Sequence, residues 1–207
     1  MILKNLKIMT NPLLSILIPT IVGREEECSR LVEKIMANTH SSVEVTIEKD
    51  NKEITIGEKR EKLYKQSNGL FSWQVDDDDD ISDDAIELIL KAIKENPDVD
   101  CVTFEEYVNI DGKEYKSNHS NEYADWEGDG SSLLYDGFHF HRTVYFKDVI
   151  KTELAKSVPV PRLRWAEDHE YSKLLKPLIR TEFHISEQLY KYIHIPSDPK
   201  ERYGLDK

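Results

Sequence analysis

A run of five aspartates at positions 76–80 is the part of this chain whose residue types and spacing most clearly permit chemistry. It directly follows residues 71–75, an apolar segment that predicts a buried strand. Two unit charges about 5 Å apart repel by roughly 3 kcal/mol at an effective dielectric near 20, so such a cluster attracts cations. Carboxylate oxygens suit Mg²⁺ or Mn²⁺ bound together with substrate phosphates. An exposed acidic loop or a weak Ca²⁺ site explains the run equally well when it is taken alone.

A second acidic pair, Glu167-Asp168, opens a segment in which Tyr171, Leu174 and Leu175 have helical spacing. A carboxylate close to an acceptor hydroxyl is suited to be a general base, and a neighbouring carboxylate favours a raised pKa for it. Acidic residues also favour the first turn of a helix because of the helix dipole. The pair is therefore either catalytic or a feature of a helix start.

The segments that must position these acids alternate between strand-like and helical patterns. Strands are predicted at residues 14–18, where Pro19 ends the run, and at 43–47, 71–75 and 99–108; helices are predicted around 28–35, at 58–66 and from Ser82 or Asp83 to Asn96. This β-α-β-α-β-α-β order predicts an α/β fold with a mostly parallel central sheet flanked by helices. In such a sheet ligands bind outside the carboxyl ends of the strands, which is where the aspartate run begins.

The second half of the chain has a less regular pattern. Asp111-Gly112 predicts a hairpin turn, and the polar, glycine-containing stretch 117–137 predicts a loop or flap. Two further helices are expected, one from Lys147 and one at 167–175, and two strands are expected near 180–184 and 188–195.

Composition narrows the class of protein. The 207 residues, of which 39% are hydrophobic and 33% charged, suit one soluble globular domain. A net charge of −12 argues against a nucleic-acid partner. The two cysteines, Cys28 and Cys101, lack ligand-like spacing and are expected to be buried free thiols. Residues 1–10 lack the continuous apolar run of a signal peptide, and no stretch approaches the ~20 apolar residues of a membrane span, so we expect a cytoplasmic protein without a transmembrane segment.

The order of motifs resembles that of family 2 glycosyltransferases, which share the GT-A fold. The matching segments are the first strand at 14–20, Lys59-Arg60 at the start of an Ala-Arg-Asn signature, Gly69 before the third strand, the D-x-D motif within 75–79, a Ser-Pro-Asp-Ala-Leu-like helix start at 82–86, and a Glu-Asp motif at 165–168. The chain departs from the family pattern at Glu61, where the family has Asn, and at Asp50, which stands alone where the family has an aspartate pair.

The resemblance implies one GT-A domain over residues 1–207, with 1–110 binding the nucleotide sugar and 111–207 binding the acceptor. It implies a metal-dependent inverting glycosyltransferase with Mn²⁺ or Mg²⁺ as cofactor, a nucleotide-sugar donor (a UDP-sugar is favoured) and a glycan or other hydroxyl acceptor. By this resemblance Asp168 is the general base beside Glu167. The nucleotide-sugar-binding residues implied by the resemblance are Pro19, Thr20, Arg24, Asp50, Lys59, Arg60, Asp76 and Asp77. The implied metal ligands are Asp76, Asp78, Asp79 and His194.

A structural role is an alternative interpretation for several of these residues. Lys59 and Arg60 also suit a solvated helix face, and Thr20 and Asp50 also suit turns, while His194 is as well explained as a structural histidine. Among the tryptophans, Trp126 and Trp165 are candidates for stacking on sugar rings, whereas Trp73 is expected in the core.

Two other functions compete with sugar transfer. A nucleotidyltransferase on a related scaffold would normally have a glycine-rich loop after the first strand, and residues 20–24 contain one glycine. A non-catalytic metal-binding or glycan-binding module would bind metal without transferring a sugar. A glycosidase ranks third, since it would not need a metal cluster.

Overall fold

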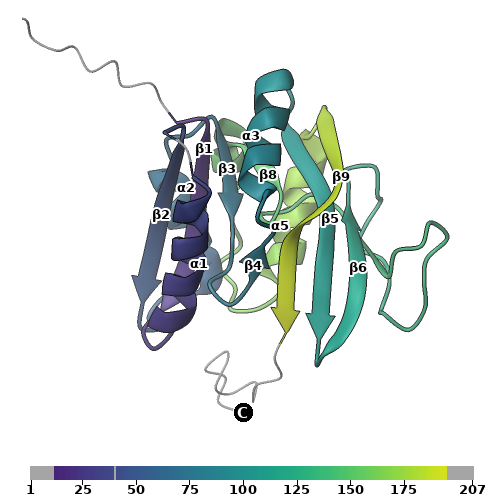
Figure 1. The fold of residues 1–207 in the computed structure, drawn as a ribbon, viewed down its shortest axis with the longest axis horizontal. Helices are drawn as coiled ribbons and strands as arrows, with labels where there is room; N and C mark the ends of the chain where they lie inside the picture. The colour runs from purple at the N-terminus through teal and green to yellow at the C-terminus, as the bar shows by residue number, and fades with distance from the viewer. Residues whose placement is uncertain (1–11, 40, 195–207) are drawn as a thin grey trace, which may run out of the picture.

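The first three strands form a parallel unit around β1, which is buried along nearly its whole length (Figure 1). The structure, a computed structural model, describes residues 12–39 and 41–194. In this unit the strands are β1 (Leu14–Ile21), β2 (Val43–Asp50) and β3 (Phe71–Gln74), and the helices that follow β1 and β2 are α1 (Glu25–Ala37) and α2 (Ile56–Gln66). A continuous apolar run suits β1 because a parallel strand is covered on both faces.

The remaining elements extend this unit into one nine-stranded sheet within the described residues. They are β4 (Asp80–Ile81), α3 (Ala85–Glu95), β5 (Cys101–Ile110), β6 (Lys113–His119), β7 (Phe140–Arg142), β8 (Val149–Lys151), α4 (Thr152–Ser157), α5 (Glu167–Leu175) and β9 (Glu182–His194). The strand order is β2-β1-β3-β8-β5-β6-β7, with β9 beside β5 and β4 paired to β9. The two longest pairings, β1 with β2 and β5 with β9, are parallel. The fold is therefore the predicted α/β class with a mostly parallel sheet and flanking helices.

The helices cover the sheet in two groups, each with its own apolar cluster. The cluster that contains Leu31, Ile35, Ile89 and Trp73 packs α1 and α3 on one face. A second cluster, which includes Leu63, Tyr171 and Ala155 among other residues, packs α2, α4 and α5 on the opposite side. Trp73 is completely buried, and Cys28 and Cys101 are buried free thiols, as predicted.

The carboxyl ends of five strands meet at one edge of the sheet. β1, β2 and β3 are mutually parallel, β5 and β9 are parallel, and the short β8 is antiparallel to both β3 and β5. β1, β2, β3, β5 and β9 therefore run in one direction, towards the lower edge in Figure 1. The aspartate run follows β3 and so begins at this edge.

Four element predictions were wrong. β1 continues through Pro19 to Ile21; it pairs with β3 only over 14–17, so at Pro19 one side of the strand has no ladder partner and a missing N–H is tolerated. The helix expected from Lys147 begins at Thr152, because residues 149–151 form β8 between β3 and β5. The residue before α3 is Asp84, whose side chain makes no capping bond to the helix.

The fourth error concerns the end of the chain and the predicted flap. Residues 182–194 are one strand, not two, and the register shifts opposite Glu105 explain the break in its alternation. The predicted end of that strand, Ile195, lies outside the described residues, as do residues 1–10 and both ends of the predicted domain 1–207. The hairpin turn at Asp111-Gly112 is confirmed, and β6 extends to His119 before the irregular segment begins.

Among the described residues, no helix is long and apolar enough to span a bilayer.

Candidate active site

A cavity of about 420 Å³ opens at the carboxyl edge of the sheet and has two walls. The N-terminal wall is formed by lining residues between 19 and 78, and the C-terminal wall by lining residues between 106 and 192. The cavity brings together eleven of the predicted site residues, which are Pro19, Thr20, Arg24, Asp50, Lys59, Arg60, Asp76, Asp77, Asp78, Glu167 and Asp168. Asp79 and His194 are not among the residues that line it.

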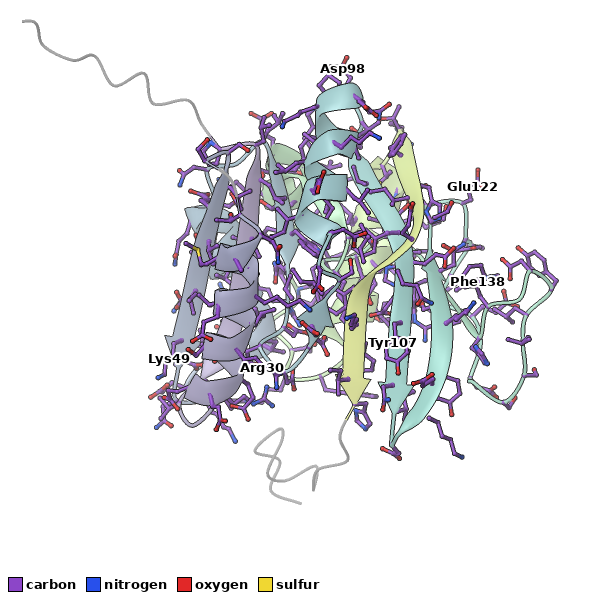
Figure 2. All side chains as sticks on the ribbon, viewed as in Figure 1. Arg30, Lys49, Asp98, Tyr107, Glu122 and Phe138 are labelled. Carbon is purple, nitrogen blue, oxygen red and sulfur yellow. The ribbon has the colours of Figure 1, made fainter. Side chains whose placement is uncertain are left out.

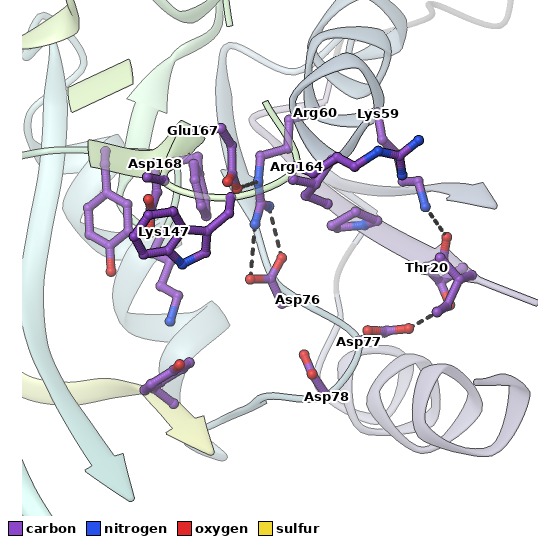
Figure 3. A pocket seen from close by; sticks show the side chains of 18 of the residues that line it. Thr20, Lys59, Arg60, Asp76, Asp77, Asp78, Lys147, Arg164, Glu167 and Asp168 are labelled. Atoms are coloured by element: carbon purple, nitrogen blue, oxygen red, sulfur yellow. Dashed lines mark hydrogen bonds and ion pairs between the residues drawn. The ribbon is translucent and has the colours of Figure 1, made fainter. Parts of the chain in front are cut away.

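Arg60 is the residue that joins the two acidic motifs (Figure 3). Its Nη1 and Nη2 donate to the two carboxylate oxygens of Asp76 at 2.8 and 3.1 Å, and its Nε donates to Glu167 Oε1 at 3.1 Å. The guanidinium also lies 3.4 Å from the centroid of the Phe146 ring. Burial opposes the charge of Arg60, but the Asp76 and Glu167 carboxylates outweigh it and raise the pKa of Arg60. Arg60 therefore positions two carboxylates from segments more than 90 residues apart in the sequence.

Lys59, the neighbour of Arg60, connects the ends of β1 and β2. Its ammonium donates to the backbone oxygen of Thr20 at 2.5 Å and forms an ion pair with Asp50. A capping box between Thr55 and Glu58 fixes the start of α2. In contrast to Arg30, which lies on the solvent side of α1 (Figure 2), both Lys59 and Arg60 are buried, so the solvated-face reading of these two residues was wrong.

The five aspartates do not form one cluster, because their side chains contact different parts of the protein. Asp77 accepts from Thr20 Oγ1 at 2.6 Å and from Arg24 Nη1 at 2.7 Å. Arg24 Nη1 also lies 3.0 Å from Asp78 Oδ2. Asp80 pairs with Lys34 on α1 at 3.1 Å. Arginine and lysine side chains of the protein thus form ion pairs with the aspartate run, which largely compensates the repulsion expected between its carboxylates.

Asp79 is held away from the cavity. Its side chain is 1% exposed and accepts from Tyr190 Oη at 2.7 Å and from the Ile193 N–H at 2.9 Å. Burial and the charges of neighbouring aspartates raise the pKa of Asp79 to about 7, although nearby Lys147 acts in the opposite direction. These hydrogen bonds connect the aspartate run to β9, so Asp79 has a structural role. His194 stands opposite Ile110 at the end of β9, with its Nδ1 3.4 Å from Tyr192 Oη.

The carboxylates left at the cavity fit one kind of metal site. In the described part of the chain, no three His, Cys, Asp or Glu side chains converge as a metal-binding group. Mg²⁺, however, is commonly bound by one or two carboxylates together with substrate phosphates. Asp76 and Asp78 line the cavity with side chains 21% and 31% exposed, so they fit that arrangement but not a metal cage built from protein alone.

The Glu-Asp pair is divided in its contacts. Ala166, with φ of 62°, turns the chain in the left-handed region directly before α5. The buried Glu167 points to Arg60, and burial raises the pKa of Glu167 although Arg60 opposes this. Asp168 is half-buried and lines the cavity, where its Oδ1 accepts from the N–H of His169 at 2.8 Å. Both adjacent acids line the cavity, but Glu167 is buried and ion-paired with Arg60, whereas Asp168 is half-buried and accepts from a backbone N–H.

Several residues of the C-terminal wall were not predicted as site residues. Lys147 Nζ lies 3.1 Å from Glu106 Oε1, 3.4 Å from Asp79 Oδ2 and 3.9 Å from the centroid of the Tyr192 ring. Despite burial, these carboxylates raise the pKa of Lys147, and Lys147 is the main charge that lowers the pKa of Glu106 to about 2. No local signal marks this network, because its members come from separate elements.

Arg142 and Arg164 are further unpredicted cations of this wall. Alternation along residues 138–142 places Phe140 and Arg142 on one face of the strand and His139 and His141 on the other. Phe140 and Arg142 line the cavity, whereas His141 is buried outside it and contacts Asp136 at 2.9 Å. The alternation was therefore the signal that could have found Arg142. Trp126 and Trp165 also line the cavity, and Trp165 is 69% exposed.

Comparisons with known proteins support the fold. No protein-family model and no curated protein matches the chain. Among solved structures, it resembles S. aureus TarS residues 1–349 (16% identity, 87% of this chain and 60% of that chain, TM-score 0.62) and the same protein in complex with UDP-GlcNAc (15%, 89% and 59%, TM-score 0.65). A complex of TarS 1–349 with UDP matches at 16% identity over 91% of this chain and 61% of that chain, with a TM-score of 0.62.

The chain spans about three fifths of the length of these TarS chains. At this level of identity the likeness establishes shared architecture. The α/β domain described above has the GT-A type of fold.

Proposed function

We propose that the chain is a glycosyltransferase that moves a sugar from a nucleotide-sugar donor to an acceptor hydroxyl. The observation that carries this proposal is the link Asp76–Arg60–Glu167, which brings the aspartate run and the Glu-Asp pair to one cavity. The TarS structures support it, because that protein shares the fold and was solved with UDP and with UDP-GlcNAc. We therefore favour a UDP-sugar donor and a family 2 type of transferase.

The two walls divide the work in this proposal. Residues of 1–110, among them Thr20, Asp50 and Arg24, bind the nucleotide, and residues of 111–207 bind the acceptor. Asp78 with Asp76 would hold Mg²⁺ or Mn²⁺ together with the donor phosphates. When bound, the ion would neutralise the diphosphate leaving group.

Asp168 is the general base of the proposed reaction. Its carboxylate takes the proton of the acceptor hydroxyl, whose oxygen bonds to the anomeric carbon while the bond to the donor phosphate oxygen breaks on the opposite face. This single displacement inverts the anomeric configuration. Both acids line the cavity, but Glu167 is ion-paired with Arg60, so we assign this role to Asp168.

The first test is Asp168→Ala. A general base contributes about 10²–10⁴-fold to rate, so kcat should fall by at least that range while nucleotide affinity stays unchanged. Glu170→Gln is the matched control, because Glu170 lies in the same helix turn, pairs with Lys173 and does not line the cavity. Near-normal transfer by Asp168→Ala would refute the assignment. Metal binding without transfer from any donor would instead favour a binding module.

The second test measures UDP affinity by calorimetry with Mg²⁺ or Mn²⁺ and again with a chelator. Binding should depend on the ion, and Asp78→Asn should weaken that dependence, because this carboxylate lines the cavity. Asp80→Asn is the control, since Asp80 pairs with Lys34 on α1 and does not line the cavity. Equal affinity with and without chelator would remove the metal from the proposal and leave the transferase intact.

A further inference from the structure

Arg142 is a cavity arginine that is held firmly in place but has no counter-charge in contact. Its Nη1 donates to the backbone oxygens of Glu127 at 2.9 Å and His141 at 2.8 Å. The guanidinium carbon lies 4.9 Å from the centroid of the Trp126 ring and 4.8 Å from that of Phe140. These contacts fix the plane of the guanidinium through cation–π interactions and neutral acceptors.

The remaining donors of Arg142 have no acceptor. A guanidinium carries five N–H groups, and within residues 12–39 and 41–194 the bonds of Arg142 come from Nη1 alone. No carboxylate of the described residues lies within 4.0 Å of it, in contrast to the buried Lys59, Arg60 and Lys147, which each contact at least one. Burial accordingly lowers the pKa of Arg142, but an arginine stays protonated throughout the working range of pH.

Two neighbouring residues of the same wall also have unpaired polar groups. The indole Nε1 of Trp126 and the hydroxyl of Ser117 are buried and meet no hydrogen-bond partner in the described structure. Both residues line the cavity, as Arg142 does. Buried donors without acceptors are uncommon in folded proteins because each forfeits its hydration. Two such buried groups beside a half-buried arginine with unused donors indicate a site whose acceptors come from a ligand.

We propose that Arg142, Trp126 and Ser117 form an oxyanion-binding subsite, and that the acceptor substrate carries a phosphate or carboxylate group that occupies it. The proposal rests on the proposed transferase function. Arginine suits this role because its fork binds the two oxygens of a phosphate or carboxylate in parallel.

The location of the subsite assigns the anion to the acceptor. Arg142 and Trp126 belong to the C-terminal wall, which also holds Asp168, the proposed base. The donor diphosphate instead has Arg24 and the carboxylates Asp76 and Asp78 on the opposite wall. An anionic group next to the reacting hydroxyl therefore fits the acceptor side of the cavity.

The first arm of the test measures binding of inorganic phosphate at constant ionic strength, without metal, by calorimetry and tryptophan fluorescence. Wild-type protein and Arg24→Gln should both bind phosphate at the subsite, and Arg142→Gln should lose at least about tenfold in affinity. Arg162→Gln removes the same charge outside the cavity and should have no effect. Arg142→Lys, which keeps the charge but not the fork, should retain part of the affinity and shows whether the wall remains folded. If phosphate affinity does not depend on position 142, the subsite does not exist.

The second arm compares transfer to a neutral sugar, its phosphate monoester and its uronic acid. Wild-type kcat/KM should favour the anionic acceptors by at least about tenfold; Arg142→Gln should abolish this preference, and the control Arg162→Gln should keep it. Equal use of neutral and anionic acceptors would overturn the inference and leave the transferase standing. A preference for donors with a uronic sugar that depends on Arg142 would reassign the anion to the donor. Phosphate binding that depends on Arg142, without transfer to any acceptor, would refute the transferase and, with it, the acceptor assignment.

Discussion

The two walls of the cavity balance their charges in different ways. On the N-terminal wall, cations and carboxylates pair with each other: Lys59 with Asp50, and Arg24 with Asp77. On the C-terminal wall, Arg142 contacts aromatic rings and backbone oxygens but no described carboxylate. The charges of the first wall are thus matched within the protein, as is Lys147 on the second wall, whereas Arg142 is the cation for which we propose an anionic substrate group as partner.

The same contrast appears between the two arginines that lie over aromatic rings. Arg60 is surrounded by Asp76, Glu167 and the ring of Phe146, so its removal leaves two carboxylates without their cation. Removal of Arg142 leaves no buried charge behind. A buried charge that loses its partner is far more costly than the replacement of an unpaired charge by an apolar side chain.

The largest effect is therefore expected from Arg60→Met compared with Arg142→Met. Loss of Arg60 should lower the free energy of unfolding by about 3–5 kcal/mol, because Asp76 and Glu167 become uncompensated. Arg142→Met should change it by no more than about 1 kcal/mol, because Arg142 is half-buried and the lost bonds to carbonyls are offset by the removal of a partly desolvated charge. Urea denaturation at pH 7 without substrate measures both. Equal losses would mean that Arg142 is a structural cation, and the contrast between the walls would fail.

The stability of the protein should depend on pH through a buried network of His119, Glu106 and Asp148 beneath the C-terminal wall. His119 is completely buried, 3.0 Å from Asp148 and 3.2 Å from Glu106. Burial opposes its charge, but the two carboxylates outweigh this and raise the pKa of His119 to about 9. The resulting stability is fully present below the unfolded value near 6.5 and is lost as pH rises through about 9. The loss corresponds to roughly 3 kcal/mol, since one pKa unit is about 1.4 kcal/mol.

The measurement is the free energy of unfolding between pH 6 and 9.5 for wild type and His119→Gln, with His139→Gln as the control outside this network. His119→Gln, but not His139→Gln, should flatten the decline of the free energy of unfolding at high pH. Glu106, whose pKa is lowered to about 2, contributes stability that is present above about pH 4.5 and lost below it, so the plateau should lie between these limits. A decline that persists in His119→Gln would place its source outside this network.

The smallest effect is expected at Gly57, where the N-terminal wall contacts the segment before α5. A Cβ at Gly57 would lie 1.8 Å from the backbone oxygen of Pro161, so the 161–163 segment must move. Gly57→Ala should cost about 1–3 kcal/mol of stability, as overpacking does, and should reduce transfer because α5 carries Asp168. Gly112→Ala, in the hairpin turn with φ of 79° and open space around its Cβ position, controls for backbone strain alone. Transfer reduced equally by both substitutions would argue against this contact as a support of the site.

Much of the cavity could be predicted because these signals are local. The apolar run of β1, the aspartates after β3 and the helical spacing after Glu167 each lie within about ten residues, and the strand order then brings their ends to one edge. The burial of Lys59 and Arg60 could not be predicted in this way. A charged helix pattern indicates solvent, and only partners 9 to 107 positions away make burial of these side chains compatible with stability.

The order of elements, the edge where the acids gather and the two motifs that meet there follow from the amino-acid pattern. Which acids reach the cavity depends on long-range contacts that form only in the folded chain. Asp78 and Asp79 are adjacent and chemically identical, yet Asp79 is bound by Tyr190 and Ile193 on a strand more than 100 residues away. Asp78 stays at the cavity. The state of a charged side chain depends on the distance to other charges and to water, and the chain sets those distances only when it folds.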